Sequence, residues 1–132
     1  MKKILLPAFG LFLTFSAKAD TINCSFTEPF IVTSYSMAEQ TLTYVNPIGK
    51  NGKEEVSVIN NVSFQIQAAG VFELVSKDGK VLQTLKLNYN GSDGMSDTVY
   101  PYDVKDNSPI MTSNMGFGGC TSNNLKAKED RK

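Results

Sequence analysis

The chain has 132 residues, of which 20% are charged and 41% are hydrophobic, so it can build one globular domain. Thirteen Lys and Arg residues balance thirteen Asp and Glu residues, which does not suit a basic nucleic-acid-binding protein. The sequence contains no histidine, which excludes Ser–His–Asp and Cys–His catalysis and most zinc sites.

Residues 1–19 have the pattern of a secretory signal peptide. Lys2 and Lys3 precede an apolar run over residues 4–15, and Ala17 and Ala19 supply small residues before a cleavage site. The run is too short to cross a bilayer, which takes about 20 residues. The residues directly before Cys24 do not suit lipid attachment. We therefore expect an exported protein, periplasmic or secreted, without a membrane span or a lipid anchor.

Removal of residues 1–19 leaves ten basic residues against thirteen acidic ones. The exported chain is therefore mildly acidic. This balance argues against electrostatic binding to anionic lipid or to nucleic acid.

The rest of the chain alternates apolar and polar residues in short runs, which predicts β-strands rather than helices. Asn51-Gly52 and Asp78-Gly79 predict tight hairpin turns. Pro101 cannot donate to a strand ladder, so it predicts an edge or a bulge. The expected strands cover residues 22–26, 30–36, 41–45, 62–66, 71–76, 81–87, 98–105 and 116–121, and Val56 and Val58 also alternate with polar neighbours.

About eight short strands, spaced near twelve residues apart, are typical of a small antiparallel barrel or sandwich. We expect this all-β fold to form a single domain over residues 20–121. Residues 122–132 are polar and charged, and they predict a flexible tail.

Two cysteines, Cys24 and Cys120, lie 96 positions apart near the ends of this domain. An even cysteine count in an exported chain favours a disulfide, which would place the first and last strands side by side. The alternatives are two free thiols or a bridge between molecules. A redox pair is disfavoured because the chain has no Cys-x-x-Cys spacing.

The stretch over residues 90–97 is rich in Gly, Ser and Asp. One interpretation is a Ca²⁺ site that uses Asp93 and Asp97, although the order of residues does not follow an EF-hand loop. The favoured interpretation is a turn whose Asp and Ser side chains cap backbone amides. Glu28 could also form an acid–base pair with these aspartates, but no spacing brings the carboxylates together.

Tyr100 and Tyr102 are two residues apart, which places both side chains on one face of a regular strand. Such a pair can form a binding surface, because tyrosine is rigid and amphipathic, or it can cover the edge of a core.

Two groups of residues resemble the signatures of a known family. The first is Cys24-Ser25-Phe26-Thr27-Glu28-Pro29-Phe30, and the second is Asp93-Gly94-Met95-Ser96-Asp97 followed by Tyr100-Pro101-Tyr102 and Gly119-Cys120. The family comprises small, largely uncharacterised bacterial envelope proteins, many assigned as lipoproteins and some grouped with lysozyme-inhibitor-like domains. Ile31 stands where the family usually has tryptophan.

The resemblance implies an envelope location, a pairing of Cys24 with Cys120, and a meeting of Glu28 with the 93–97 loop near that bridge. A carboxylate aimed at the amides of a Gly-rich turn would act as a structural clasp of about 1.5–3 kcal/mol. The family implies no established activity, and we expect no cofactor.

Three functional hypotheses follow from the sequence. The first is a non-enzymatic envelope module with a binding or structural role, whose partner is an envelope protein. The second is an inhibitor of a cell-wall hydrolase such as lysozyme, since an acidic protein suits a basic enzyme. The third is a Ca²⁺-dependent or carboxylate-based enzyme.

Overall fold

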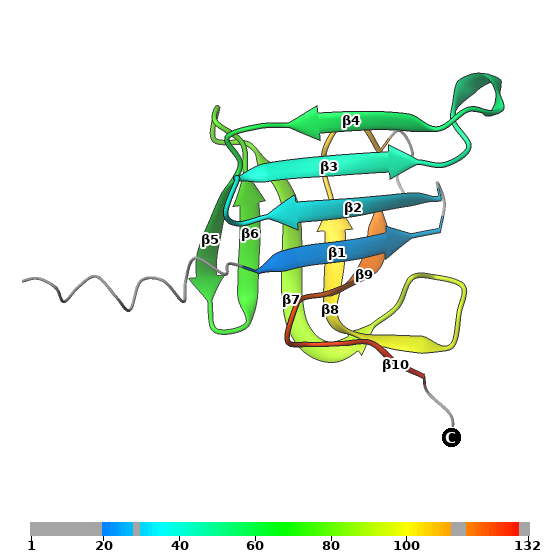
Figure 1. Ribbon diagram of the computed structural model, residues 1–132. Coiled ribbons are helices and arrows are strands. Elements are labelled where there is room, and N and C mark those ends of the chain that lie inside the picture. The colour runs from blue at the N-terminus through cyan, green and yellow to red at the C-terminus, as the bar shows by residue number, and fades with distance from the viewer. Residues whose placement is uncertain (1–19, 28–29, 112–115, 130–132) are drawn as a thin grey trace, which may run out of the picture.

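A computed structural model describes residues 20–27, 30–111 and 116–129 (Figure 1). In these ranges the protein is built from β-strands and one short 3-10 turn, with no α-helix. None of the described segments forms a helix long and apolar enough to span a membrane. The strands are β1 (Thr21–Phe26), β2 (Ile31–Ser36), β3 (Thr41–Asn46), β4 (Glu55–Ile59), β5 (Ser63–Ala68), β6 (Val71–Val75), β7 (Val81–Gly91), β8 (Thr98–Asp106), β9 (Phe117–Thr121) and β10 (Lys128–Glu129).

The strands form one antiparallel sheet in the order β4-β3-β2-β1-β9-β8-β7-β6-β5. The sheet curls so that β1–β4 lie across β5–β8, as Figure 1 shows. The ends of this order, β4 and β5, do not pair with each other, so the barrel stays open. The expectation of a small all-β antiparallel fold is confirmed.

Two tight turns adopt the backbone that their sequences predict. Asn51 and Gly52 both have positive φ, 64° and 71°, in the turn that joins β3 to β4. Gly79 has φ 87° between β6 and β7, and its amide donates to the carbonyl of Ser76. Gly and Asn take this left-handed backbone at little cost, which is why these pairs favour hairpins.

The core lies between the two parts of the curled sheet. Along β1, β2 and β3 every second side chain is buried, as period-two alternation requires. The same interior receives apolar side chains from β6, β7 and β8. The buried hydrophobic residues include Ile22, Phe26, Ile31, Tyr35, Leu42, Tyr44, Val62, Leu74, Leu82, Leu85 and Val104.

The disulfide joins Cys24 of β1 to Cys120 of β9. The two residues face each other directly in the antiparallel ladder, and both are buried. The predicted disulfide is confirmed, and so is the prediction that the strands carrying the two cysteines, β1 and β9, lie side by side. The bridge thus closes a long loop between the two parts of the sheet.

After β9 the chain turns back, and the amide of Ser122 donates to the carbonyl of Leu125. Lys128 and Glu129 then pair with Val99 and Thr98 at the start of β8. Within the segment that the sequence suggests as a tail, Lys128 and Glu129 therefore form a short strand against β8. The predicted signal peptide, residues 1–19, lies outside the described residues.

Candidate functional site

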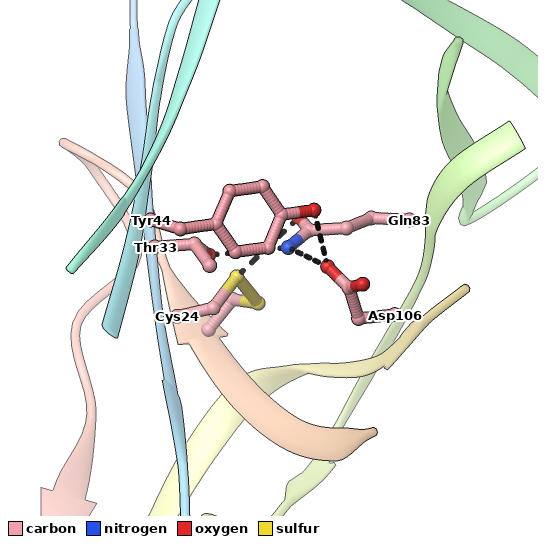
Figure 2. Close-up of a disulfide and its surroundings, with 6 residues drawn as sticks. Cys24, Thr33, Tyr44, Gln83 and Asp106 are labelled. Carbon is pink, nitrogen blue, oxygen red and sulfur yellow. Dashed lines mark hydrogen bonds between the residues drawn. A yellow bond between two sulfur atoms is a disulfide. The ribbon is translucent and has the colours of Figure 1, made fainter. Parts of the chain in front are cut away.

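A buried polar network lies beside the disulfide and joins the two parts of the sheet (Figure 2). Nε2 of Gln83, on β7, donates to Oδ2 of Asp106 at 2.9 Å and to Oγ1 of Thr33 at 3.1 Å. The hydroxyl of Tyr44, on β3, donates to the same Asp106 oxygen at 2.7 Å. Because Thr33 and Tyr44 come from β2 and β3, these bonds cross the core to β7 and β8.

Asp106 is a buried carboxylate, which is costly unless donors surround it. Its second oxygen accepts the backbone amide of Ser108 at 2.8 Å, which brings its donors to three. Burial raises the pKa of Tyr44 well above its usual range, and the charge of Asp106 raises that pKa further. The Tyr44 hydroxyl therefore stays protonated and serves as a fixed donor. This network is structural and has no exposed group on which chemistry could act.

A second constellation, at the surface, is the turn over residues 93–97, hereafter the 93–97 turn. Oδ1 of Asp93 accepts the amides of Met95 and Ser96 at 2.9 and 2.8 Å. Its Oδ2 accepts the hydroxyls of Ser96 at 2.8 Å and Tyr100 at 3.2 Å. The Gly94 amide donates to Oγ of Ser92. The turn is thus capped by its own Asp and Ser side chains.

These contacts also set the ionisation of Asp93. Partial burial alone would raise its pKa, but hydrogen bonds from Met95, Ser96 and Tyr100 together hold the pKa below its ordinary value. The pKa of Tyr100 shifts in the opposite direction. Burial raises it, and the Asp93 carboxylate raises it further. At neutral pH the pair is therefore a carboxylate that accepts from a neutral phenol.

The 93–97 turn rests on the end of β1. The hydroxyl of Thr27 donates to the backbone carbonyl of Asp93. Gly94, at φ 94°, passes so close to Thr27 that a Cβ there would lie 3.3 Å from the Thr27 hydroxyl oxygen. The two sequence signatures therefore meet through Thr27. Glu28, the residue expected in this clasp, lies outside the described residues.

Tyr100 and Tyr102 do not share one face of β8, so that prediction is wrong. Tyr102 packs towards the core, where its ring meets Phe72 edge-on at 6.2 Å. Tyr100 instead lies against the outer side of Gly119, where a Cβ would collide with its ring. The ladder is irregular at this place, because β7 has a bulge between Leu87 and Gly91 opposite Pro101, the residue between the two tyrosines. The irregularity predicted at Pro101 is confirmed.

The remaining candidate, Asp97, is exposed and makes no side-chain hydrogen bond to a described residue. Both oxygens of Asp93 are occupied by donors within the turn. Within the described ranges no three acidic or cysteine side chains gather as metal ligands would. The geometry therefore matches an amide-capping turn more closely than a Ca²⁺ site, which needs six to eight oxygens.

The chain was compared with family models, with curated proteins and with solved structures, and none of them matches it.

Several residues that build these sites were not among the sequence candidates. Ser96 and Thr27 hold the 93–97 turn, and Asx and Ser/Thr turn patterns could have indicated Ser96. Gln83 and Asp106 form the core network, but each lies in a strand with polar neighbours. A single sequence gives no signal that would bring them together.

Proposed function

We propose that this protein is an exported, non-enzymatic binding module of a bacterial envelope, and that its 93–97 turn contacts a partner protein. The signal-like segment at residues 1–19 and the buried disulfide support export to an oxidising compartment. The resemblance of two motifs to an envelope family supports the same location.

The observation that carries the proposal is the exposure of Met95 on a turn held by several hydrogen bonds. Met95 is 67% exposed, while the amides of Gly94, Met95, Ser96 and Thr98 all donate to side chains of Ser92, Asp93 and Ser96. A partner therefore meets the Met95 thioether and the exposed Asp97 carboxylate rather than free amides. A preorganised turn loses little entropy on binding, and methionine adapts to an apolar pocket.

Substitution at Met95 tests this proposal against a matched control. The purified, unreduced protein is immobilised and challenged with a bacterial envelope extract, alongside Met95→Gln and Ile48→Gln. Ile48 is similarly exposed, at 70%, but lies in the β3–β4 turn. We expect one partner to be retained by wild type and Ile48→Gln, and to bind about tenfold more weakly to Met95→Gln. Absence of any such partner, or equal retention by all three proteins, would reject the proposal.

A second candidate function is inhibition of a cell-wall hydrolase such as lysozyme. The exposed Asp97 beside Met95 favours it, because a carboxylate on a rigid turn suits a basic active-site cleft. Inhibition should then approach one molecule per enzyme, weaken with added salt and fall in Asp97→Asn. Full lysozyme activity with the protein in excess would dismiss this candidate.

A further inference from the structure

A cleft of about 370 Å³ lies between the start of β8, the end of β7 and the returning segment 124–128. Its volume falls in the range of small-molecule sites. None of its described lining residues belongs to the 93–97 turn, so the cleft is a surface distinct from the proposed partner contact. Its walls are aromatic and aliphatic, formed by Tyr89, Val99, Tyr100, Pro101, Leu125 and Ala127.

Tyr89 occupies a backbone conformation that does not suit its side chain. Its φ is 55°, in the left-handed region that Gly and Asn adopt readily and bulky residues rarely adopt. Packing does not explain the choice of residue, since Tyr89 is 58% exposed. The unfavourable backbone nevertheless places an aromatic ring at the wall of the cleft. Strained residues of this kind concentrate at ligand-binding sites.

The other aromatic wall is fixed in position. The Tyr100 ring lies against Gly119, and its hydroxyl donates to Oδ2 of Asp93 at 3.2 Å. The ring therefore cannot turn away without breaking that bond. A ligand that stacks on Tyr100 meets a surface that is already in place.

The charged residues that line the cleft are both basic. Lys126 and Lys128 contribute to its lining, and Asn124 adds an amide. None of the described lining residues is acidic. Two ammonium groups beside aromatic walls suit a negatively charged group attached to a ring.

We propose that this cleft binds a small organic anion, whose ring lies between Tyr89 and Tyr100 and whose carboxylate, sulfonate or phosphate group is held by Lys126 and Lys128. The ligand class follows from the walls and the charges together. In this proposal Tyr89 contributes its ring to binding, although its φ of 55° is unfavourable for a bulky side chain.

Anilinonaphthalene sulfonate, an aromatic anion, is a direct probe, and phenylnaphthylamine is its uncharged counterpart. We expect saturable binding of the sulfonate to the folded, unreduced protein. Lys126→Gln/Lys128→Gln should bind it about tenfold more weakly and lose the salt dependence. Lys86→Gln/Lys105→Gln removes two lysines from elsewhere on β7 and β8 and should bind like wild type.

Tyr89→Asn provides the second test. Asparagine tolerates the left-handed backbone, so the Tm should stay equal or rise, while binding weakens about fivefold. Met95→Gln should bind the probe normally, which separates this proposal from the partner contact. No saturable binding, equal binding of the uncharged dye, or no loss in the cleft variants would each overturn the proposal.

Discussion

The side-chain amide of Gln83 donates to the Asp106 carboxylate across 2.9 Å, in the interior and next to the Cys24–Cys120 bridge. Its second proton is directed to Thr33 of the facing part of the sheet. The carbonyl oxygen of Gln83 lies 4.0 Å from the Cys24 sulfur, which carries no proton and so makes only a contact. The two parts of the open sheet are thus connected across the core by hydrogen bonds as well as by the disulfide.

Loss of the Tyr44 hydroxyl tests how much these hydrogen bonds contribute to stability. Tyr44→Phe leaves the buried Asp106 with one donor fewer and should lower the free energy of unfolding by about 2 kcal/mol. Tyr102→Phe is the control, because Tyr102 makes no hydrogen bond to a described residue, and it should cost less than about 0.5 kcal/mol. Urea denaturation measures both, and equal effects would contradict the assigned role of Tyr44.

The same tyrosine predicts an alkaline limit to stability. The pKa of Tyr44 is raised in the folded state above its ordinary value of 10.0, so folding favours the protonated phenol. Its contribution is fully present below about pH 10 and is lost as the pH rises above that value. The free energy of unfolding, measured by urea denaturation at several values from pH 8 to 11, should therefore fall less steeply with pH for Tyr44→Phe than for wild type.

The disulfide should supply a large share of the stability. It closes a loop with a sequence separation of 96, for which chain entropy predicts about 4.7 kcal/mol. We expect Cys24→Ser/Cys120→Ser to lose an amount of this order in urea denaturation. Thiol titration of the unreduced wild type should find no free sulfhydryl, and two accessible thiols would contradict the fold.

Asp93 should make the surface turn sensitive to acid. Its folded-state pKa lies below its ordinary value of 3.8, so its contribution is present above about pH 4 and is lost as the pH falls further. Asp93→Asn should cost about 1 kcal/mol at pH 7 and almost nothing near pH 2. Asp97→Asn should stay within about 0.5 kcal/mol of wild type at both pH values. A loss in Asp93→Asn that did not depend on pH would refute this account.

Calcium should leave the protein unchanged. Both Asp93 oxygens already accept hydrogen bonds within the turn, so a metal would have to displace those donors. Thermal melts with and without millimolar Ca²⁺ should therefore superimpose. A rise in Tm that disappears in Asp93→Asn would instead support the calcium hypothesis.

The sequence predicts those features of the fold that depend on neighbouring residues. Alternation predicts the strands, and Asn51-Gly52 and Asp78-Gly79 predict two hairpins because their backbone preference is local. The cysteine count and the export pattern predict the bridge. The family resemblance implies that the segment after Cys24 meets the 93–97 turn. In the structure Thr27 makes this contact, through its hydrogen bond to the Asp93 carbonyl.

Other features depend on register and could not be predicted from one sequence. Pro101 marks the irregularity opposite the bulge between Leu87 and Gly91, but it does not tell that Tyr100 and Tyr102 lie on different faces of β8. Gln83 and Asp106 meet because β7 and β8 pair in one register among several possible ones. The strand β10 is two residues long, too short to show alternation.

We infer that Asp93 holds the 93–97 turn in one conformation, in which Met95 is exposed. Amide hydrogen exchange measured by NMR tests it most directly, because the Met95 and Ser96 amides donate to Asp93 at 2.9 and 2.8 Å. We predict that both amides exchange at least about tenfold more slowly than in an unstructured peptide, and that Asp93→Ala, which removes the acceptor, abolishes this protection. If both wild-type amides exchange as fast as in an unstructured peptide, Asp93 does not hold the turn.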